Sequence, residues 1–367
     1  MKKLLLITLA AFVMTNCAKE SVVDSGLDKG GNKIAFSSYS TITKGTPIAN
    51  NNEFMANGNI FGVTAFSTAA SDAPYMGTAG AGAPIISNGT AWDYKNSGDT
   101  RFWPTDAAKK LNFFAYAPFG NTNRVAPAFT KASGMVFTDY IVSTEIVKQD
   151  DFMYASALDQ TKPIGGTAVN LMFHHAMTQI LFKARVKTDD SLYVDIAKDG
   201  ISLHKIKSKG TFTLSATATA AWAGQSTPTS YTVASAAVTL HGTKGVDVKD
   251  VFTTNNVLML LPQEFAAWDK TTPDPSTQTG GYLSLQCKLY YKDAKGVKQY
   301  LKGDDTNFAT INVPLSSKDG VSTEIWKMRN KITYTLLIDG TMAQLDPITF
   351  TTTVENWNDV VGGDVTL

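Results

Sequence analysis

The sequence has few cysteines, few charged residues and no long apolar segment. Only 18% of its 367 residues are charged, and 33 Lys and Arg stand against 32 Asp and Glu, for a net charge of +1. The chain therefore lacks the basic excess that neutralises a phosphate backbone, which argues against nucleic acid as a partner. The hydrophobic content of 43%, together with the small net charge, excludes a disordered chain.

Motifs of catalysis and cofactor binding are also missing. The sequence contains no HExxH, no GxSxG and no GxxxxGK(S/T) motif. The paired aspartates at 150–151 and 304–305 lack the spacing of a calcium loop. His174 and His175 are neighbours in an expected strand, so they point to opposite faces and cannot hold one metal ion together. We expect no catalytic residue, cofactor or metal. A secreted glycosidase, whose carboxylates pair in space rather than in sequence, is a distant alternative.

The amino-terminal residues have the pattern of an export signal. Two lysines precede an apolar run that is too short to span a bilayer, so residues 1–16 are expected to form a signal peptide. Cys17 follows directly, at the position of a lipidated cysteine, and residues 17–33 are expected to form a tether. The alternative is ordinary signal cleavage near Ala18. If Cys17 carries lipid, the remaining cysteine has no disulfide partner.

That remaining cysteine, Cys287, lies in an alternating segment. A period of two places it on the same face as Leu283, Leu285 and Leu289, with Gln286 on the opposite face. We expect Cys287 to be a small core residue rather than a nucleophile.

Short alternating segments separated by turn residues dominate the rest of the chain, and helical periodicity is scarce. The clearest alternation runs through residues 169–186, which predict one long strand or a bent pair, with Ile180 and Phe182 facing inward. Such patterns are typical of all-β proteins. At this chain length we expect two β-sandwich domains in tandem, over residues 34–164 and 165–367.

Residues 71–96 are rich in Ala, Gly, Ser and Asn and look like a long surface excursion. Trp92 and Tyr94 lie at its end. Exposed aromatic rings at this place would stack on a sugar or contact a partner protein, so both residues are candidate ligand contacts. The other tryptophans lie beside expected strands, where packing in the core is the more common outcome: Trp103, Trp222, Trp268, Trp326 and Trp357.

A series of short segments extends in order along nearly the whole chain: IAF at 34–36, TKG at 43–45, FGVTAF at 61–66, FWP at 102–104, LNFFAYAP at 111–118, DFMYA at 151–155, LMFHHAM at 171–177, LMLLPQ at 258–263, YTL at 334–336 and VENW at 354–357. Together they resemble the fimbrillin family, the type V pilins of Bacteroidales. The resemblance implies transthyretin-like β-sandwich domains, a lipoprotein precursor and assembly into surface fimbriae. It also implies proteolysis after a basic residue, which removes the leader and the first strand, and a groove that then accepts a strand from a neighbouring subunit.

The residues of the leader fit these expectations. Ile34, Phe36 and Ile42 share one face of the leading strand. Lys44, followed by Gly45, is the basic residue at which cleavage would free this strand. An open edge of that kind recruits another strand. The alternative is that Lys44 is an ordinary turn lysine.

At the other end of the sequence, Val361, Val365 and Leu367 share one face and are expected to form a short donor strand. The alternative is that these residues complete the chain's own sheet. We therefore expect a structural subunit, shaft or tip, of a cell-surface fimbrium, exported as an outer-membrane lipoprotein and bound to other fimbrial subunits. The alternative function is a non-polymerising outer-membrane lipoprotein, either a fimbrial anchor or a protein that binds a surface glycan.

Overall fold

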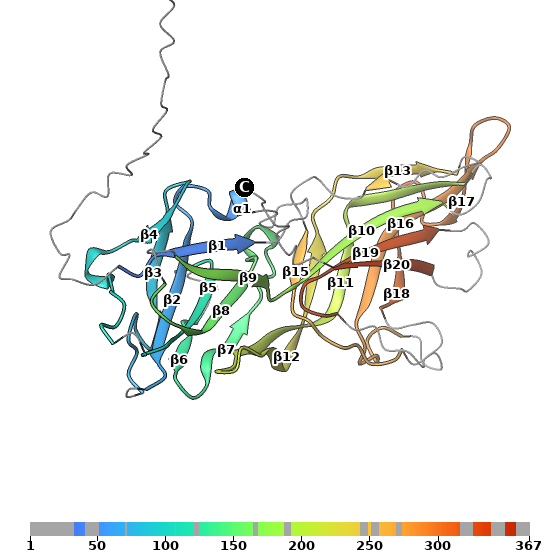
Figure 1. Cartoon of the computed structure of the whole chain (residues 1–367). Helices are drawn as coiled ribbons and strands as arrows, with labels where there is room; N and C mark the ends of the chain where they lie inside the picture. The colour runs from blue at the N-terminus through green and yellow to red at the C-terminus, as the bar shows by residue number, and fades with distance from the viewer. Residues whose placement is uncertain are drawn as a thin grey trace, which may run out of the picture.

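The computed structural model describes residues 33–40, 51–69, 72–106, 108–120, 125–163, 168–186, 192–242, 249–250, 257–268, 274–315, 326–338 and 349–356. These residues form an elongated molecule built almost entirely of β-strands (Figure 1). The regular exceptions among them are the helix α1 (Asn51–Phe54) and the 3-10 helices Ser97–Asp99 and Ile146–Lys148. No described helix is long and apolar enough to cross a membrane. The prediction of an all-β fold is confirmed.

The first sheet contains seven strands in the order β1-β9-β8-β5-β2-β3-β4. Its strands are β1 (Phe36–Ser40), β2 (Ile60–Ser67), β3 (Ala83–Ser87), β4 (Trp92–Tyr94), β5 (Leu111–Ala117), β8 (Met153–Gln160) and β9 (Val169–His175). The central strands β2 and β5 are buried on both faces, so apolar residues fill nearly every position and each face of the sheet contributes to a core.

Residues 71–96 are not a surface excursion, because they supply β3 and β4 of this sheet. Ala83 and Ile85 are fully buried. Their small neighbours serve close packing: a Cβ added to Gly77 or Gly82 would lie 2.6 or 2.8 Å from the carbonyl oxygen of Val63 on β2. The Ala and Gly content that suggested a loop reflects this close approach of two backbones.

The large sheet contains eight strands, with the path β17-β16-β11-β7-β6; β12 and β13 pair with β11, and β18 pairs with β16. Its strands are β6 (Ala128–Thr130), β7 (Gly134–Ile141), β11 (Tyr193–Leu214), β12 (Ala220–Val233), β13 (Val238–His241), β16 (Tyr282–Lys292), β17 (Lys298–Lys302) and β18 (Ala309–Pro314).

The small sheet contains five strands, with the path β14-β10-β19-β20 and with β15 paired to β10. Its strands are β10 (Thr178–Val186), β14 (Lys249–Asp250), β15 (Leu258–Leu260), β19 (Asn330–Ile338) and β20 (Thr349–Asn356). The alternation expected in β10 is confirmed, since Ile180, Phe182 and Ala184 are fully buried. Residues 169–186 form the bent pair, because β9 and β10 belong to different sheets.

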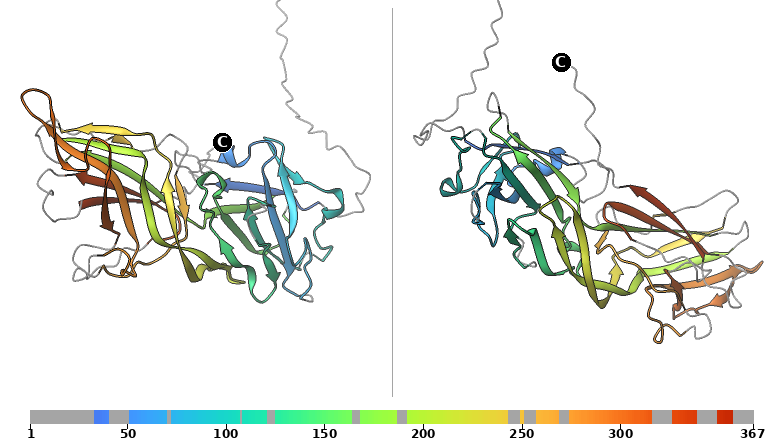
Figure 2. Two further views of the ribbon diagram at one scale, coloured as in Figure 1. Left: turned by 180° about the vertical axis from the view of Figure 1, so that it is seen from behind. Right: turned by 60° about the horizontal axis from the view of Figure 1, so that its bottom comes forward.

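The long strand β11 joins the two halves of the molecule (Figure 2). Residues at its start pair with β13 and β16, whereas Lys209–Leu214 pair with β7, which comes from the first half of the chain. The change from the first sheet to the small sheet falls between His175 and Thr178. β6 and β7, which come from the first half of the chain, belong to the large sheet. The division into domains at residues 164 and 165 stays a prediction.

The buried side chains form two clusters. One lies inside the first sheet and includes Phe36, Phe61 and Phe113. The other begins on the opposite face of the first sheet, at residues such as Phe114, and continues between the large and small sheets. Cys287 is fully buried in this second cluster, and burial raises the pKa of its thiol to about 12. The expectation that Cys287 is a core residue is confirmed.

Hydrogen bonds stabilise the turn at residues 176–177, where the chain passes from β9 of the first sheet to β10 of the small sheet. Trp222 Nε1 on β12 donates to the carbonyl oxygen of Ala176 at 2.7 Å. The backbone N–H of Arg329 donates to the carbonyl of Met177 at 3.0 Å. His175 Nδ1 lies 2.6 Å from a carboxylate oxygen of Asp151, and both side chains are buried. Buried polar contacts of this kind stabilise one arrangement of the chain.

Candidate functional site

The candidate functional site is the groove that β1 fills at the edge of the first sheet. Five residues of β1 pair in parallel with β9, from Phe36 opposite Val169 to Ser40 opposite Phe173. Just before β1, Lys33 forms an antiparallel bridge with Phe102, beyond the end of β4. β1 is therefore the edge strand of the first sheet beside β9 (Figure 1), and the residue before it also bridges to the segment that follows β4.

The buried inward residues here are Phe36 and Ser38 of β1 and Ile34, two residues before the strand, and they are 5%, 3% and 0% exposed. The ring of Phe36 packs edge-on against those of Phe61 and Phe113, at centroid distances of 5.9 and 6.0 Å. Edge-on aromatic pairs add to the gain from burial alone. Together these contacts make β1 part of the core although it is a short edge strand.

Trp92 forms the wall of the groove beneath Ser38. Its indole Nε1 donates a hydrogen bond of 2.7 Å to the Ser38 hydroxyl oxygen. Its ring packs against Phe54 and Phe61, at centroid distances of 5.2 and 4.8 Å, and only 6% of the residue is exposed. Tryptophan is accommodated here because its one polar atom has a partner.

The rim of the groove carries an ion pair. The Lys33 ammonium contacts the Asp93 carboxylate, and it lies 5.4 Å from the centre of the Tyr94 ring. Burial raises the pKa of Tyr94, so this hydroxyl stays neutral. Since 44% of the Lys33 side chain and 61% of the Asp93 side chain are exposed, the ion pair adds little stability. The groove holds β1 mainly through its apolar contacts and backbone hydrogen bonds.

Two separate predictions meet at this site. Ile34 and Phe36 of the expected leader strand face inward as predicted, and Trp92 and Tyr94 lie against that strand. While β1 is in place, a sugar cannot stack on Trp92, because core side chains cover its ring. The role of Trp92 as an exposed ligand contact is therefore corrected, since the ring faces the chain's own β1. Tyr94 is half-buried.

The remaining predicted site residues lie outside the described part of the chain. They are Cys17, Ile42, Lys44, Gly45, Val361, Val365 and Leu367. The sequence reasoning did not single out Ser38. The available signal was a hydroxyl group on the same face as Ile34 and Phe36, where a buried hydroxyl requires a hydrogen-bond partner.

His204 lies between two serine hydroxyls on the outer face of the large sheet. Its Nδ1 is 2.9 Å from Ser230 Oγ and its Nε2 is 2.7 Å from Ser284 Oγ. Burial lowers the pKa of the imidazole. A nucleophilic serine needs a base that a third group orients and donors for an oxyanion. Here the second nitrogen meets another serine, so the contact joins β12, β11 and β16 to one another.

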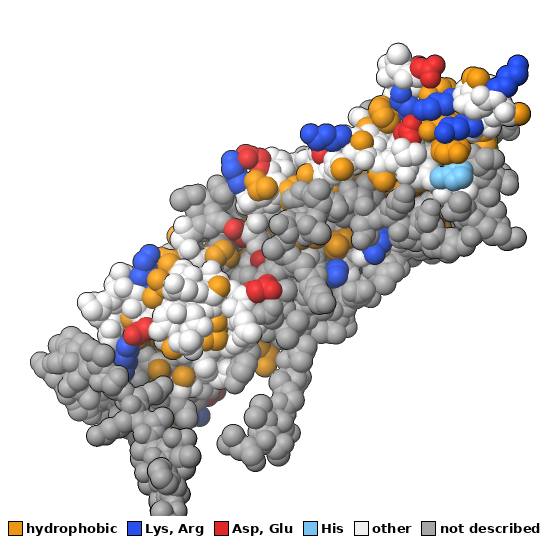
Figure 3. All heavy atoms as spheres, turned by 90° about the horizontal axis from the view of Figure 1, so that it is seen from above, with side chains coloured by type: hydrophobic (Ala, Val, Ile, Leu, Met, Phe, Trp, Pro, Cys, Tyr) orange, Lys and Arg blue, Asp and Glu red, His pale blue; other side chains and the backbone are white. Residues whose placement is uncertain are grey.

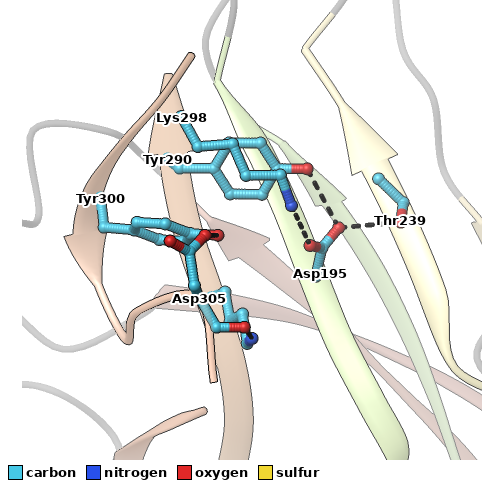
Figure 4. Close-up of polar contacts among 7 residues, drawn as sticks. Asp195, Thr239, Tyr290, Lys298, Tyr300 and Asp305 are labelled. Atoms are coloured by element: carbon cyan, nitrogen blue, oxygen red, sulfur yellow. Dashed lines mark hydrogen bonds and ion pairs between the residues drawn. The ribbon is translucent and has the colours of Figure 1, made fainter. Parts of the chain in front are cut away.

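A further polar cluster lies at the end of the large sheet (Figure 4). Asp195 accepts hydrogen bonds from Thr239 Oγ1 at 2.8 Å and from the Tyr290 hydroxyl at 3.3 Å, and its other oxygen is 3.6 Å from Lys298 Nζ. The rings of Tyr193 and Tyr290 stack at 5.3 Å. Burial, and secondly the nearby Asp195 carboxylate, raise the pKa of Tyr290.

Neighbouring side chains continue this cluster, and lysines gather at this end of the molecule (Figure 3). The Tyr300 hydroxyl donates to Asp305 at 2.9 Å, and Lys288 Nζ donates to the Asp305 carbonyl at 2.8 Å. The cluster therefore ties four strands together through its own donors and acceptors. Within the described residues, no group of three His, Cys, Asp or Glu side chains could hold a metal ion.

Comparison with solved structures supports the fold. A fimbrial protein from Bacteroides vulgatus has a TM-score of 0.59 and 18% identity, over 89% of this chain and 99% of that chain. A cell adhesion protein from Bacteroides uniformis has a TM-score of 0.49 and 15% identity, over 89% and 100% of the two chains. The tip fimbrial protein Mfa3 from Porphyromonas gingivalis has a TM-score of 0.39 and 11% identity, over 87% and 99%. Of these three, the first bears on the fold.

Comparison of sequences gives the family. No match is found among curated proteins. The sequence does match the fimbrillin-like family over residues 46–357, which is most of the chain. The resemblance inferred from short segments is therefore confirmed. The chain belongs to the fimbrillin-like family, and it is a structural rather than an enzymatic protein.

Proposed function

We propose that this protein is a structural subunit, shaft or tip, of a cell-surface fimbrium and that it assembles with other fimbrial subunits by exchange of β-strands. Membership of the fimbrillin-like family supports the fimbrial role. The observation that supports strand exchange is the place of β1. This short strand comes early in the chain, forms the edge of a sheet and covers an aromatic core with Ile34 and Phe36.

Removal of β1 would leave a groove that another strand can fill. The backbone groups of β9 that pair with β1 would lose their partners, and an unpaired strand edge recruits a new strand. Burial of two large apolar side chains stabilises the filled groove by about 3–6 kcal/mol, at about 1.5–3 kcal/mol each. An empty groove is therefore unfavourable, and an incoming strand with similar inward residues restores most of the lost stability.

In this proposal the chain is exported as an outer-membrane lipoprotein through Cys17. Cleavage between Lys44 and Gly45 then separates the leader, including β1, from the rest of the chain. Val361, Val365 and Leu367 provide the strand that this subunit donates to the groove of another subunit. The mature protein resides at the cell surface within the fimbrium.

The test is the N-terminal residue and intact mass of the protein recovered from the cell surface. We expect a chain that starts at Gly45 and carries no lipid. A diacylated Cys17 that is still attached would contradict removal of the leader and would indicate a fimbrial anchor. Lys44→Ala should leave the leader in place and abolish fibres, whereas Lys148→Ala, at an exposed lysine outside the groove, serves as the matched control.

A further inference from the structure

Among the inward side chains of the leading strand that the structure describes, one is not explained by apolar packing. Ile34 and Phe36 are apolar, but Ser38 is polar and only 3% exposed. Its hydroxyl oxygen accepts the hydrogen bond from Trp92 Nε1, and the Trp92 ring is itself buried against Phe54 and Phe61. The indole N–H thus depends on a side chain of the strand that fills the groove.

We infer that the groove recognises its strand by an inward pattern of large apolar, large apolar and hydroxyl residues at alternate positions, and that Trp92 selects the hydroxyl. This inference rests on the proposed strand exchange. The expected partner is a strand from another subunit. At the position that Ser38 occupies in β1, this strand carries Ser or Thr, and Thr adds one methyl group.

The selectivity has a physical basis in the groove. The ladder between β1 and β9 uses backbone groups, which every strand offers, so it does not distinguish one sequence from another. An apolar residue in place of Ser38 would leave the indole N–H buried without an acceptor. The loss of such a hydrogen bond weakens binding by about ten-fold or more.

The same pattern argues against a second copy of this chain as the donor. Val361, Val365 and Leu367 share one face of the expected donor strand, and Gly363 is the residue between them on that face. None of these four residues carries a hydroxyl group, and Thr366 falls on the opposite face. The groove therefore favours the strand of a different subunit, which makes the polymer mixed in composition.

Peptide exchange into the full chain tests this inference. A protease recognition sequence is inserted between Lys44 and Gly45, and the chain is cut so that the leader stays bound only by contacts. Labelled peptides then compete for the groove: residues 31–44, the same peptide with Ser38→Ala, and residues 357–367. Fluorescence anisotropy measures the affinity of each peptide.

We expect the natural peptide to bind about ten-fold more tightly than the Ser38→Ala peptide, with the 357–367 peptide no better than the latter. In a Trp92→Phe chain the two leader peptides should bind equally. Trp222→Phe is the matched control, because it removes an indole hydrogen bond of the same length to Ala176, outside the groove, and should keep the preference.

Equal affinity of the natural peptide and the Ser38→Ala peptide for the unsubstituted chain would overturn the inference and leave strand exchange intact. Tight binding of the 357–367 peptide would overturn the preference for a different subunit. If even the natural peptide fails to enter the cut chain, the proposed strand exchange itself is refuted, and the inference with it. The peptide series on the unsubstituted chain decides the question even if Trp92→Phe does not fold.

Discussion

Gly134 provides the sharpest test of how the two halves are joined. It begins β7, the strand that brings the first half of the chain into the large sheet, and its φ of 76° lies in the left-handed region. A Cβ at this position would lie 2.2 Å from the carbonyl oxygen of Leu214, at the end of β11. Neither backbone can yield without disturbing the pairing of β7 with β11.

The expected loss can be worked out from two contributions. An L-residue in the left-handed region costs about 1–2 kcal/mol. Alanine also lowers the conformational entropy of the unfolded chain, which offsets this cost by about 0.4–1 kcal/mol. The clash with the Leu214 carbonyl requires a backbone shift that costs about 1–3 kcal/mol more. Gly134→Ala should therefore lower the free energy of unfolding by about 3 kcal/mol.

Gly224→Ala carries only the first contribution, so its comparison with Gly134→Ala isolates the cost of the clash. Gly224 also has a left-handed φ, 62°, but a Cβ there would meet nothing within 4 Å. Its loss should be about 1 kcal/mol or less. Urea denaturation at 25 °C, followed by tryptophan fluorescence with the m-value checked for each variant, measures both. A Gly134→Ala loss no larger than that of Gly224→Ala would refute the argument from the close approach of β7 to β11.

Three further predictions concern single side chains. Phe36→Ala should lower the free energy of unfolding by about 3–5 kcal/mol because it leaves a cavity under β1. Ser37→Ala, on the other face of the strand, should change this free energy by less than about 0.5 kcal/mol. Urea denaturation compares the two variants, and similar losses would contradict the packing of Phe36. At pH 8, Cys287 should react with iodoacetamide about a thousand-fold more slowly in the folded chain than in urea, because burial raises the thiol pKa to about 12. Peptide mass mapping measures the labelling, and rapid labelling of the folded chain would contradict the burial of Cys287. Burial lowers the folded pKa of His204, so the unfolded chain binds a proton first and stability falls as pH drops below about 6.5. His204→Gln should reduce the fall in urea midpoint between pH 7.5 and 5.5, and an unchanged fall would show that other groups cause it.

Local alternation predicted much of this fold correctly. The inward faces of β10 and of β1, and the burial of Cys287, follow from a period of two, because each strand has one face on a core. Alternation with a period of two did not reveal β11. Its positive φ values at Asp199 and Lys205 accompany irregularities in pairing that break the alternation, so a strand from Tyr193 to Leu214 could not be recognised.

The environment of Trp92 could not be predicted because its partners are remote in sequence. Its hydrogen-bond acceptor, Ser38, is 54 residues away, and β1 reaches the groove through parallel pairing with β9. A composition rich in small residues next to Trp92 suggested a loop, whereas close packing against β2 is the actual reason for it. The inward Ser38 was visible in the sequence, but its meaning depends on a tertiary contact.

The course of β11 also determines how the molecule would carry a load. One end of this strand pairs with β16 and the other with β7, so a pull that separates the two halves acts along the strand. Hydrogen bonds loaded in this direction must slide and break together, whereas bonds pulled open from one end break one after another. A subunit connected in this way resists stretching as a single body, and under tension we expect the contacts between subunits to yield before the halves of a subunit part.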